Sequence, residues 1–254
     1  MSQTQIITLT IILLILISAS YAMYSLFVSA KLFYDKADEI EAKAKAAKTK
    51  KELEYLYNEC FIPFSRTCFH ERLSARIREL NMMFLTKYEN MPDDSRTGYA
   101  VEYQKIKKHY GNQVAKRSKV PLINHIDEGI AILKEIGANN DTIAAYCLHP
   151  LLQADDALTN NIHLLDNYQN NFRVILTMEY RRVANNYLSK RTIQSLDDIE
   201  LSPLRGVNQM LWADKLQNQK DFRLYHLGKH ERSDILEQYF INWINKLEPI
   251  IKKY

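Results

Sequence analysis

The segment from Ile6 to Ala30 is largely apolar and carries no charged side chain. The run from Ile6 to Ile17 is almost solidly aliphatic, and apolar residues continue to Ala30 on every face. At ~1.5 Å per residue the segment from Ile6 to Ala30 forms a helix of about 37 Å, which is enough to cross a bilayer core of roughly 30 Å. Tyr21, Tyr24 and Phe27 would then lie at the membrane interface. We therefore expect a transmembrane anchor over residues 1–30.

Charge predicts the orientation of this anchor. No Lys or Arg precedes the apolar run, whereas lysines are frequent between Lys31 and Lys51. Because positive flanks stay on the cytoplasmic side, we expect a single-pass membrane protein whose C-terminal domain is cytoplasmic. The same lysines would contact anionic membrane lipids. A buried helix and a cleaved signal peptide, with a small-x-small site at Ser20-Tyr21-Ala22, are the alternatives.

A heptad pattern follows the anchor. Apolar residues recur with 4-3-4-3 spacing at Phe33, Ala37, Ile40, Ala44 and Ala47, and the pattern breaks at Lys51. This seam is typical of a helix that pairs with a second helix. It predicts either a homodimer through residues 33–47 or, because alanine is a weak core residue, a solvated helical connector. We assign residues 31–98 to this connector and to the Pro/Gly-containing linker 91–98.

Residues 99–254 are long enough for one domain with a single core, and their pattern is helical throughout. Pro121 suits a first helical turn and Gly137 suits a helix end. No stretch alternates cleanly with the period of a strand. The predicted segments are about 99–112, 121–137, 140–151, 159–168, 172–188, 203–225 and 232–250. The predicted fold class is therefore all-α: a transmembrane helix, a helical connector and a helical domain.

Composition narrows the classes of function. The chain has 254 residues with 6 Gly and 6 Pro, fewer than turn-dense β folds normally need. The net charge of +4 comes from 34 basic and 30 acidic residues, which is too balanced to predict nucleic-acid binding. The three cysteines, Cys60, Cys68 and Cys147, are too few for a disulfide framework or a cysteine-rich zinc site.

Three residues in predicted helices have the chemistry of metal ligands. His125, His149 and Asp214 each lie within or beside apolar residues, where a lone charge is costly without a partner. Two neutral imidazoles and one carboxylate form a set that suits Mn²⁺, Fe²⁺ or Zn²⁺, with positions left for water and substrate. Taken singly, each of these residues is more typical of a structural role.

Four segments in order resemble motifs of the HD-domain metal-dependent phosphohydrolases, and within them the Rel/SpoT-like alarmone-hydrolase branch. Residues 109–113 (HYGNQ) resemble its His-x-Gly-Gln opening, and residues 116–125 (KRSKVPLINH) its Arg-Lys-Ser-Gly-Glu-Pro-Tyr-Ile-x-His segment. Residues 144–149 (AAYCLH) resemble Ala-Ala-Leu-Leu-His-Asp, and residues 212–218 (WADKLQN) resemble Leu-Ala-Asp-Arg-Leu-His-Asn. The resemblance covers roughly residues 100–225. It implies a helical HD fold in which His125, His149 and Asp214 bind a divalent metal, with Mn²⁺ as the first choice.

The chain departs from this family at the catalytic positions. Pro150 stands where the family has the ligand Asp, and Gln153 and Ala154 stand where it has an acidic pair. Asp155 and Asp156 follow directly. Either one of them replaces the missing carboxylate, or both are solvent-facing acids in a loop after the helix.

The resemblance also implies a substrate. The related hydrolases remove pyrophosphate from the 3′ position of guanosine tetra- and pentaphosphate, and their basic segment before the first His contacts the nucleotide. Lys116, Arg117 and Lys119 match that segment. We expect a metal-dependent phosphohydrolase of a phosphorylated guanine nucleotide. The alternatives are an inactive nucleotide-sensing or interaction module, and a membrane-interaction protein that uses its C-terminal helices as a scaffold.

Overall fold

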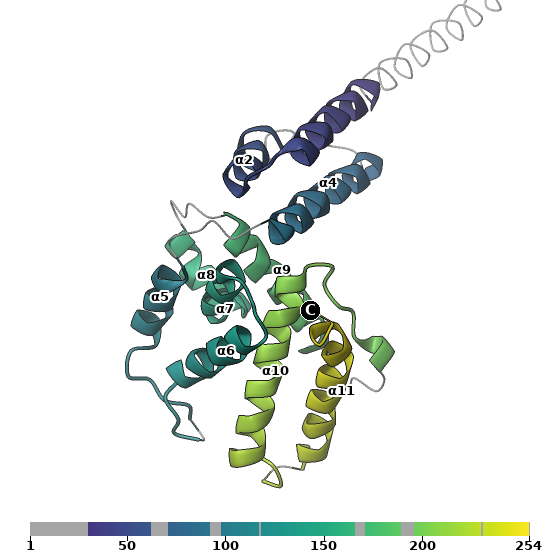
Figure 1. Ribbon diagram of the computed structural model, residues 1–254. Coiled ribbons are helices and arrows are strands. Elements are labelled where there is room, and N and C mark those ends of the chain that lie inside the picture. The colour runs from purple at the N-terminus through teal and green to yellow at the C-terminus, as the bar shows by residue number, and fades with distance from the viewer. Residues whose placement is uncertain are drawn as a thin grey trace, which may run out of the picture. The chain divides into compact units, whose positions relative to one another are not determined.

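The computed structural model of the chain is helical (Figure 1). It describes residues 30–61, 71–91, 98–116, 118–165, 171–188, 196–229 and 231–253. Within these ranges the structure contains no strand, only an isolated antiparallel bridge between Val114 and Pro121. The predicted all-α fold is therefore confirmed. The chain divides into two compact units between Pro92 and Asp93.

The N-terminal unit is built from a helix over residues 30–46, helix α2 (Lys50–Leu56), its continuation η1 (Tyr57–Phe61) and helix α4 (Glu71–Asn90). Thr49 begins α2 because its side chain accepts a hydrogen bond from the backbone N–H of Glu52. The rings of Tyr57, Phe61 and Phe84 pack with centroids 5.2–5.4 Å apart. Aromatic packing of this kind joins η1 to α4.

The heptad seam lies inside this unit. All five of its residues are buried within a single chain, and Ala37 and Ala44 have no exposed surface. Arg76 of α4 pairs with Asp38 and Glu41 on the helix 30–46. The apolar face of residues 33–47, from which we expected a homodimer, is thus covered by side chains of the same chain.

The C-terminal unit consists of α5 (Ala100–Tyr110), α6 (Ile123–Glu135), α7 (Asn140–Leu152), α8 (Asp155–Asn161), η2 (Ile162–Leu165), α9 (Asn171–Leu188), η3 (Leu196–Asp198), α10 (Arg205–Tyr225) and α11 (Ser233–Ile251). Helix α8 begins earlier than the predicted segment 159–168. Its first turn carries Asp155 and Asp156, which favourably oppose the positive end of the helix dipole.

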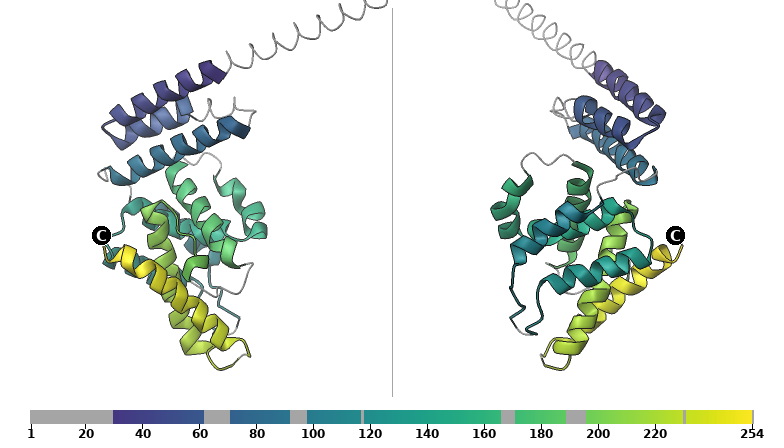
Figure 2. Two further views of the ribbon diagram at one scale, coloured as in Figure 1. Left: turned by 90° about the vertical axis from the view of Figure 1, so that its right-hand side faces the viewer. Right: turned by 60° about the vertical axis from the view of Figure 1, so that its left-hand side comes forward.

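Helices α7 and α10 form the centre of this unit. Residues 141–149 of α7 are all buried, because α5, α6, α9 and α10 pack around them. Helix α10 packs against α6, α7 and α9 and runs beside α11, as Figures 1 and 2 show. Asn139 caps the start of α7 by accepting a hydrogen bond from Thr142. Pro150 lies inside the last turn of α7, which continues to Leu152.

The predicted fold class needs one correction. No helix in the described ranges is long and apolar enough to cross a membrane. The longest of them, α10 and α4, have 21 and 20 residues, but both carry several charged side chains, which the apolar core of a bilayer disfavours. The run from Ile6 to Phe27, on which the transmembrane helix was predicted, lies outside the described residues. A single-pass membrane protein is therefore not supported.

Candidate metal centre

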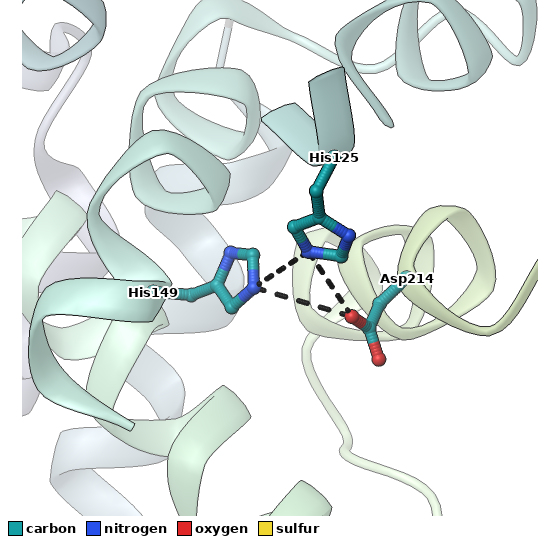
Figure 3. A group of neighbouring side chains, drawn as sticks. All are labelled: His125, His149 and Asp214. Carbon is teal, nitrogen blue, oxygen red and sulfur yellow. Dashed lines mark hydrogen bonds and ion pairs between the residues drawn. The ribbon is translucent and has the colours of Figure 1, made fainter. Parts of the chain in front are cut away.

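Three helices of the C-terminal unit each direct one side chain to a common point. His125 lies in the first turn of α6, His149 in the last turn of α7, and Asp214 near the middle of α10. Figure 3 shows the two imidazoles and the carboxylate turned toward one another. His149 and Asp214 are buried, and 22% of the His125 side chain is exposed. The cluster is thus closed on the side of α7 and α10 and reaches solvent at His125.

The distances within the cluster would allow one metal ion to contact all three residues. Nε2 of His125 lies 3.3 Å from Nε2 of His149 and 3.5 Å from Oδ1 of Asp214. The third separation, between Nε2 of His149 and Oδ1 of Asp214, is 4.0 Å. A circle through these three atoms has a radius of about 2.1 Å, which matches the roughly 2.0–2.2 Å over which zinc binds imidazole and carboxylate. The three atoms are spaced as ligands of one ion.

His149 presents an unprotonated nitrogen to this point. Its Nδ1 lies 2.6 Å from the backbone carbonyl of Tyr146, an acceptor, so Nδ1 carries the proton and Nε2 keeps its lone pair. Burial, followed by the proximity of His125, lowers the pKa of His149 to about 3. The imidazole is therefore neutral at ordinary pH, which is the form that binds metals.

His125 is held in the same way. Its Nδ1 lies 2.5 Å from Oε1 of Gln217, and its Nε2 faces His149 and Asp214. The hydroxyl of Tyr146 donates to the backbone carbonyl of His125 at 3.3 Å. This contact requires Gly129 on α6, because a Cβ there would lie 2.1 Å from the Tyr146 hydroxyl. Tyr146 can pack against α6 beside His125 only because residue 129 has no side chain.

Asp214 is held in the ionised form. Its Oδ2 accepts a hydrogen bond from Nζ of Lys215 at 2.8 Å, and its Oδ1 accepts one from Asn218 at 2.8 Å. Burial disfavours the charged carboxylate, but the Lys215 ammonium outweighs this penalty and holds the pKa of Asp214 well below its usual range. Lys215 is itself buried and lies over the rings of Tyr239 and Trp243 on α11.

This arrangement fits a divalent cation. The hydroxyl of Tyr146 lies 3.4 Å from Nε2 of His125. With both imidazole protons on Nδ1, two imidazole nitrogens and one carboxylate oxygen converge as electron-pair donors, and none of the three donates to the others. Such a set is repulsive by itself and attractive around a positive ion. Neutral imidazole and carboxylate together suit Zn²⁺, Mn²⁺ or Fe²⁺. In the part of the chain that the structure describes, this is the group of His, Cys, Asp and Glu side chains that could hold a metal.

The two candidate catalytic acids lie apart from the cluster. Asp155 is exposed and pairs with Arg181 of α9, and Asp156 accepts a hydrogen bond from the backbone N–H of Ala157 within its own helix. Neither belongs to the group of potential ligands. Pro150 and Gln153 at the end of α7 offer no carboxylate. The structure thus assembles His125, His149 and Asp214 but not a fourth acidic residue.

The candidate nucleotide-binding residues are in the loop between α5 and α6. Lys116 and Lys119 are exposed there, and Lys119 has a positive φ of 61°. Arg117 lies outside the described residues. Both described lysines make their charge available to solvent.

Three supporting residues were not predicted from the sequence. Tyr146 and Gln217 bind the Nδ1 protons of the two histidines, and Lys215 binds Asp214. Lys215 could have been found, because it directly follows Asp214 in the sequence and a buried carboxylate needs a cationic partner. For Gln217 the signal is weak, because its partner is 92 positions away in the chain.

Comparisons with protein-family models, with curated proteins and with solved structures find no match to this chain. The chemistry of the site therefore rests on the residues and distances given above.

Proposed function

We propose that residues 98–253 form an HD-like domain that binds one divalent metal ion through His125, His149 and Asp214 and slowly hydrolyses a phosphorylated guanine nucleotide. The observation that carries the proposal is the convergence of three unprotonated ligand atoms on one point. The order of the four motif-like segments supports the HD assignment, and Mn²⁺ is the metal of first choice.

The division of roles follows from the donor set. A bound divalent ion supplies Lewis acidity and lowers the pKa of a coordinated water. The two imidazoles contribute lone pairs without charge, and Asp214 contributes the negative charge. No described carboxylate besides Asp214 belongs to the cluster. A general base is typically worth about 10²–10⁴ in rate, so its loss predicts slow turnover.

Metal content tests the first half of this proposal. The full chain is purified, loaded with Mn²⁺ or Zn²⁺, desalted and analysed for metal. We expect about one ion per chain in the wild type, because three spaced ligands suffice. His149→Ala and Asp214→Asn should lose the metal. His163→Ala is the matched control, because His163 is exposed and lies in η2. Equal metal in His149→Ala and the wild type would overturn the site.

Hydrolysis tests the second half. We expect weak release of pyrophosphate from guanosine tetraphosphate with Mn²⁺, abolished by a chelator. Installing the family's carboxylates through Pro150→Asp, Gln153→Glu and Ala154→Asp should raise the rate by about 10²–10⁴. Full family rates that persist in the presence of chelator would contradict the assignment of these residues.

A second candidate function is an inactive nucleotide-binding module. The ion pair of Asp155 with Arg181 favours this function, because it engages the carboxylate that would otherwise replace the missing catalytic acid after α7. In that case calorimetry detects nucleotide binding that depends on His125 and Asp214, while no product forms at any metal concentration.

A further inference from the structure

The side-chain amide of Gln217 is at the centre of a small polar network beside the metal centre. Its Oε1 lies 2.5 Å from Nδ1 of His125. Its Nε2 donates to Oε2 of Glu128 at 3.2 Å and to Oδ2 of Asp221 at 2.7 Å. Gln217 is buried, whereas the two carboxylates are partly exposed. The network therefore connects surface charges to a buried amide and then to a candidate ligand.

The chemistry of these groups fixes the direction of every hydrogen bond. Ionised carboxylates only accept, so Glu128 and Asp221 both require the NH₂ group of Gln217 on their side. Lys220 pairs with both carboxylates, at 3.2 Å in the case of Asp221. The amide oxygen must then face His125 and can only accept. In the neutral form of the His125 imidazole, the single proton is thereby held on Nδ1, and the lone pair of Nε2 points at the centre.

We propose that Gln217, oriented by Glu128 and Asp221, is the positioning residue that selects the metal-binding tautomer of His125. The two histidines differ in how they are fixed. His149 is buried and donates to a backbone carbonyl of its own helix, and this acceptor is fixed because it does not depend on a side-chain rotamer. His125 is the most exposed of the three ligands and its Nδ1 contacts a side chain. Without that acceptor its proton is free to occupy Nε2, where it would block the metal.

The experiment begins with the metal-free full chain, labelled with ¹⁵N-histidine. The nitrogen chemical shifts report which ring nitrogen carries the proton. We expect His125 to be the Nδ1–H tautomer in the wild type and to lose this state in Gln217→Met, which keeps the length of the side chain but removes the amide. Gln219→Met is the matched control, because Gln219 is also buried on α10 but bonds to Glu237 at 3.4 Å. It should leave the tautomer unchanged.

The second measurement is affinity for Mn²⁺, and this part rests on the proposed metal site. Loss of a partner that orients a ligand typically lowers metal affinity by about 10- to 100-fold, which we expect for Gln217→Met but not for Gln219→Met. The double variant Glu128→Gln/Asp221→Asn keeps Gln217 but removes the two charges that orient it. It should shift the tautomer in the same direction.

The outcomes separate the two proposals. A wild-type His125 with its proton on Nε2 would overturn the positioning role, as would a tautomer or an affinity that is equal in Gln217→Met and the wild type. An Nδ1–H tautomer that depends on Gln217, in a protein that binds no metal, would leave the positioning role intact and refute the metal site.

Discussion

The two ends of helix α7 carry two buried polar clusters that are built on opposite principles. Near its start, Asp141 accepts a hydrogen bond from Nε of Arg173 at 2.8 Å, and the same guanidinium donates to Glu102 of α5 at 2.9 Å. Near its end, His149 faces His125 and Asp214. Arg173, Asp141 and Glu102 of the first cluster are all buried, and hydrogen bonds connect them. In the second, three lone pairs face one another.

This difference separates a cluster whose charges are balanced by its own side chains from one that could accept a metal ion. The guanidinium brings its own positive charge and a fork of donors, so the Arg173 cluster is complete without any ligand. The histidine cluster has Lys215 on the far oxygen of Asp214 and Asn218 on the ligand oxygen, but with both imidazole protons on Nδ1 none of its three ligand atoms donates to another. Burial of charge is common to both and so does not identify a site. The convergence of three ligand atoms that do not donate to one another is the feature that favours a metal site.

Removal of the guanidinium should have the largest effect on stability. Arg173→Met leaves Glu102 and Asp141 buried without their shared cation, and breaking a buried ion pair in this way costs about 3–5 kcal/mol. Urea unfolding measures the change in the free energy of unfolding. Arg182→Met is the control, because Arg182 is about half exposed and its loss should cost little. If both variants lost the same free energy of unfolding, the Arg173 cluster would not be the stabilising ion pair described above.

Metal binding at the histidine cluster (His125, His149 and Asp214) should stabilise the folded protein. At a free Mn²⁺ concentration 100 times its Kd, binding to the folded state adds about 2.7 kcal/mol to the free energy of unfolding. Thermal unfolding with and without Mn²⁺ measures this gain. We expect none of it in His149→Ala, whereas Arg173→Met should gain fully if it remains folded. A gain that survives in His149→Ala would show that the metal binds elsewhere.

Gly129 should affect both the stability of the fold and the histidine cluster. A Cβ at this position meets the Tyr146 ring at 2.1–2.3 Å, and forcing extra volume into a packed core costs about 1–3 kcal/mol. Gly129→Ala should lower stability and weaken Mn²⁺ binding, because the displaced ring contacts His125. In a Tyr146→Ala background the same change should cost much less, and equal costs in the two backgrounds would refute the clash.

Acid should weaken the fold gradually through His149. Its folded-state pKa of about 3 lies below the ordinary value of 6.5, so between these values the unfolded chain binds more protons. Stability therefore falls as the pH drops from about 6.5 toward 3, with a slope that approaches about 1.4 kcal/mol per pH unit. Urea unfolding in the presence of chelator measures the slope. His149→Gln should reduce it and His163→Ala should not.

The sequence predicts those features that depend on local pattern. Helical periodicity predicts the all-α fold, and His125, His149 and Asp214 are found because each lies in a short motif-like segment. The partners of Arg173 and Gln217 are 32, 71 and 92 positions away, and no local pattern encodes such pairings. The heptad seam shows the same limit: its spacing predicts a partner helix, but not that the partner belongs to the same chain.

Pro150 also changes the backbone hydrogen bonding of the helix in which it lies. In a regular α-helix the amide of residue 150 would donate to the carbonyl of residue 146, and proline has no such hydrogen. The Tyr146 carbonyl is thus released from the helical ladder, and it accepts the Nδ1 proton of His149 at 2.6 Å. An aspartate at position 150 would add a carboxylate and at the same time restore a rival donor to that carbonyl. The substitution would thus gain a metal ligand but weaken the hydrogen bond that holds His149. The hydrolysis rate of Pro150→Asp reports which of the two effects is larger.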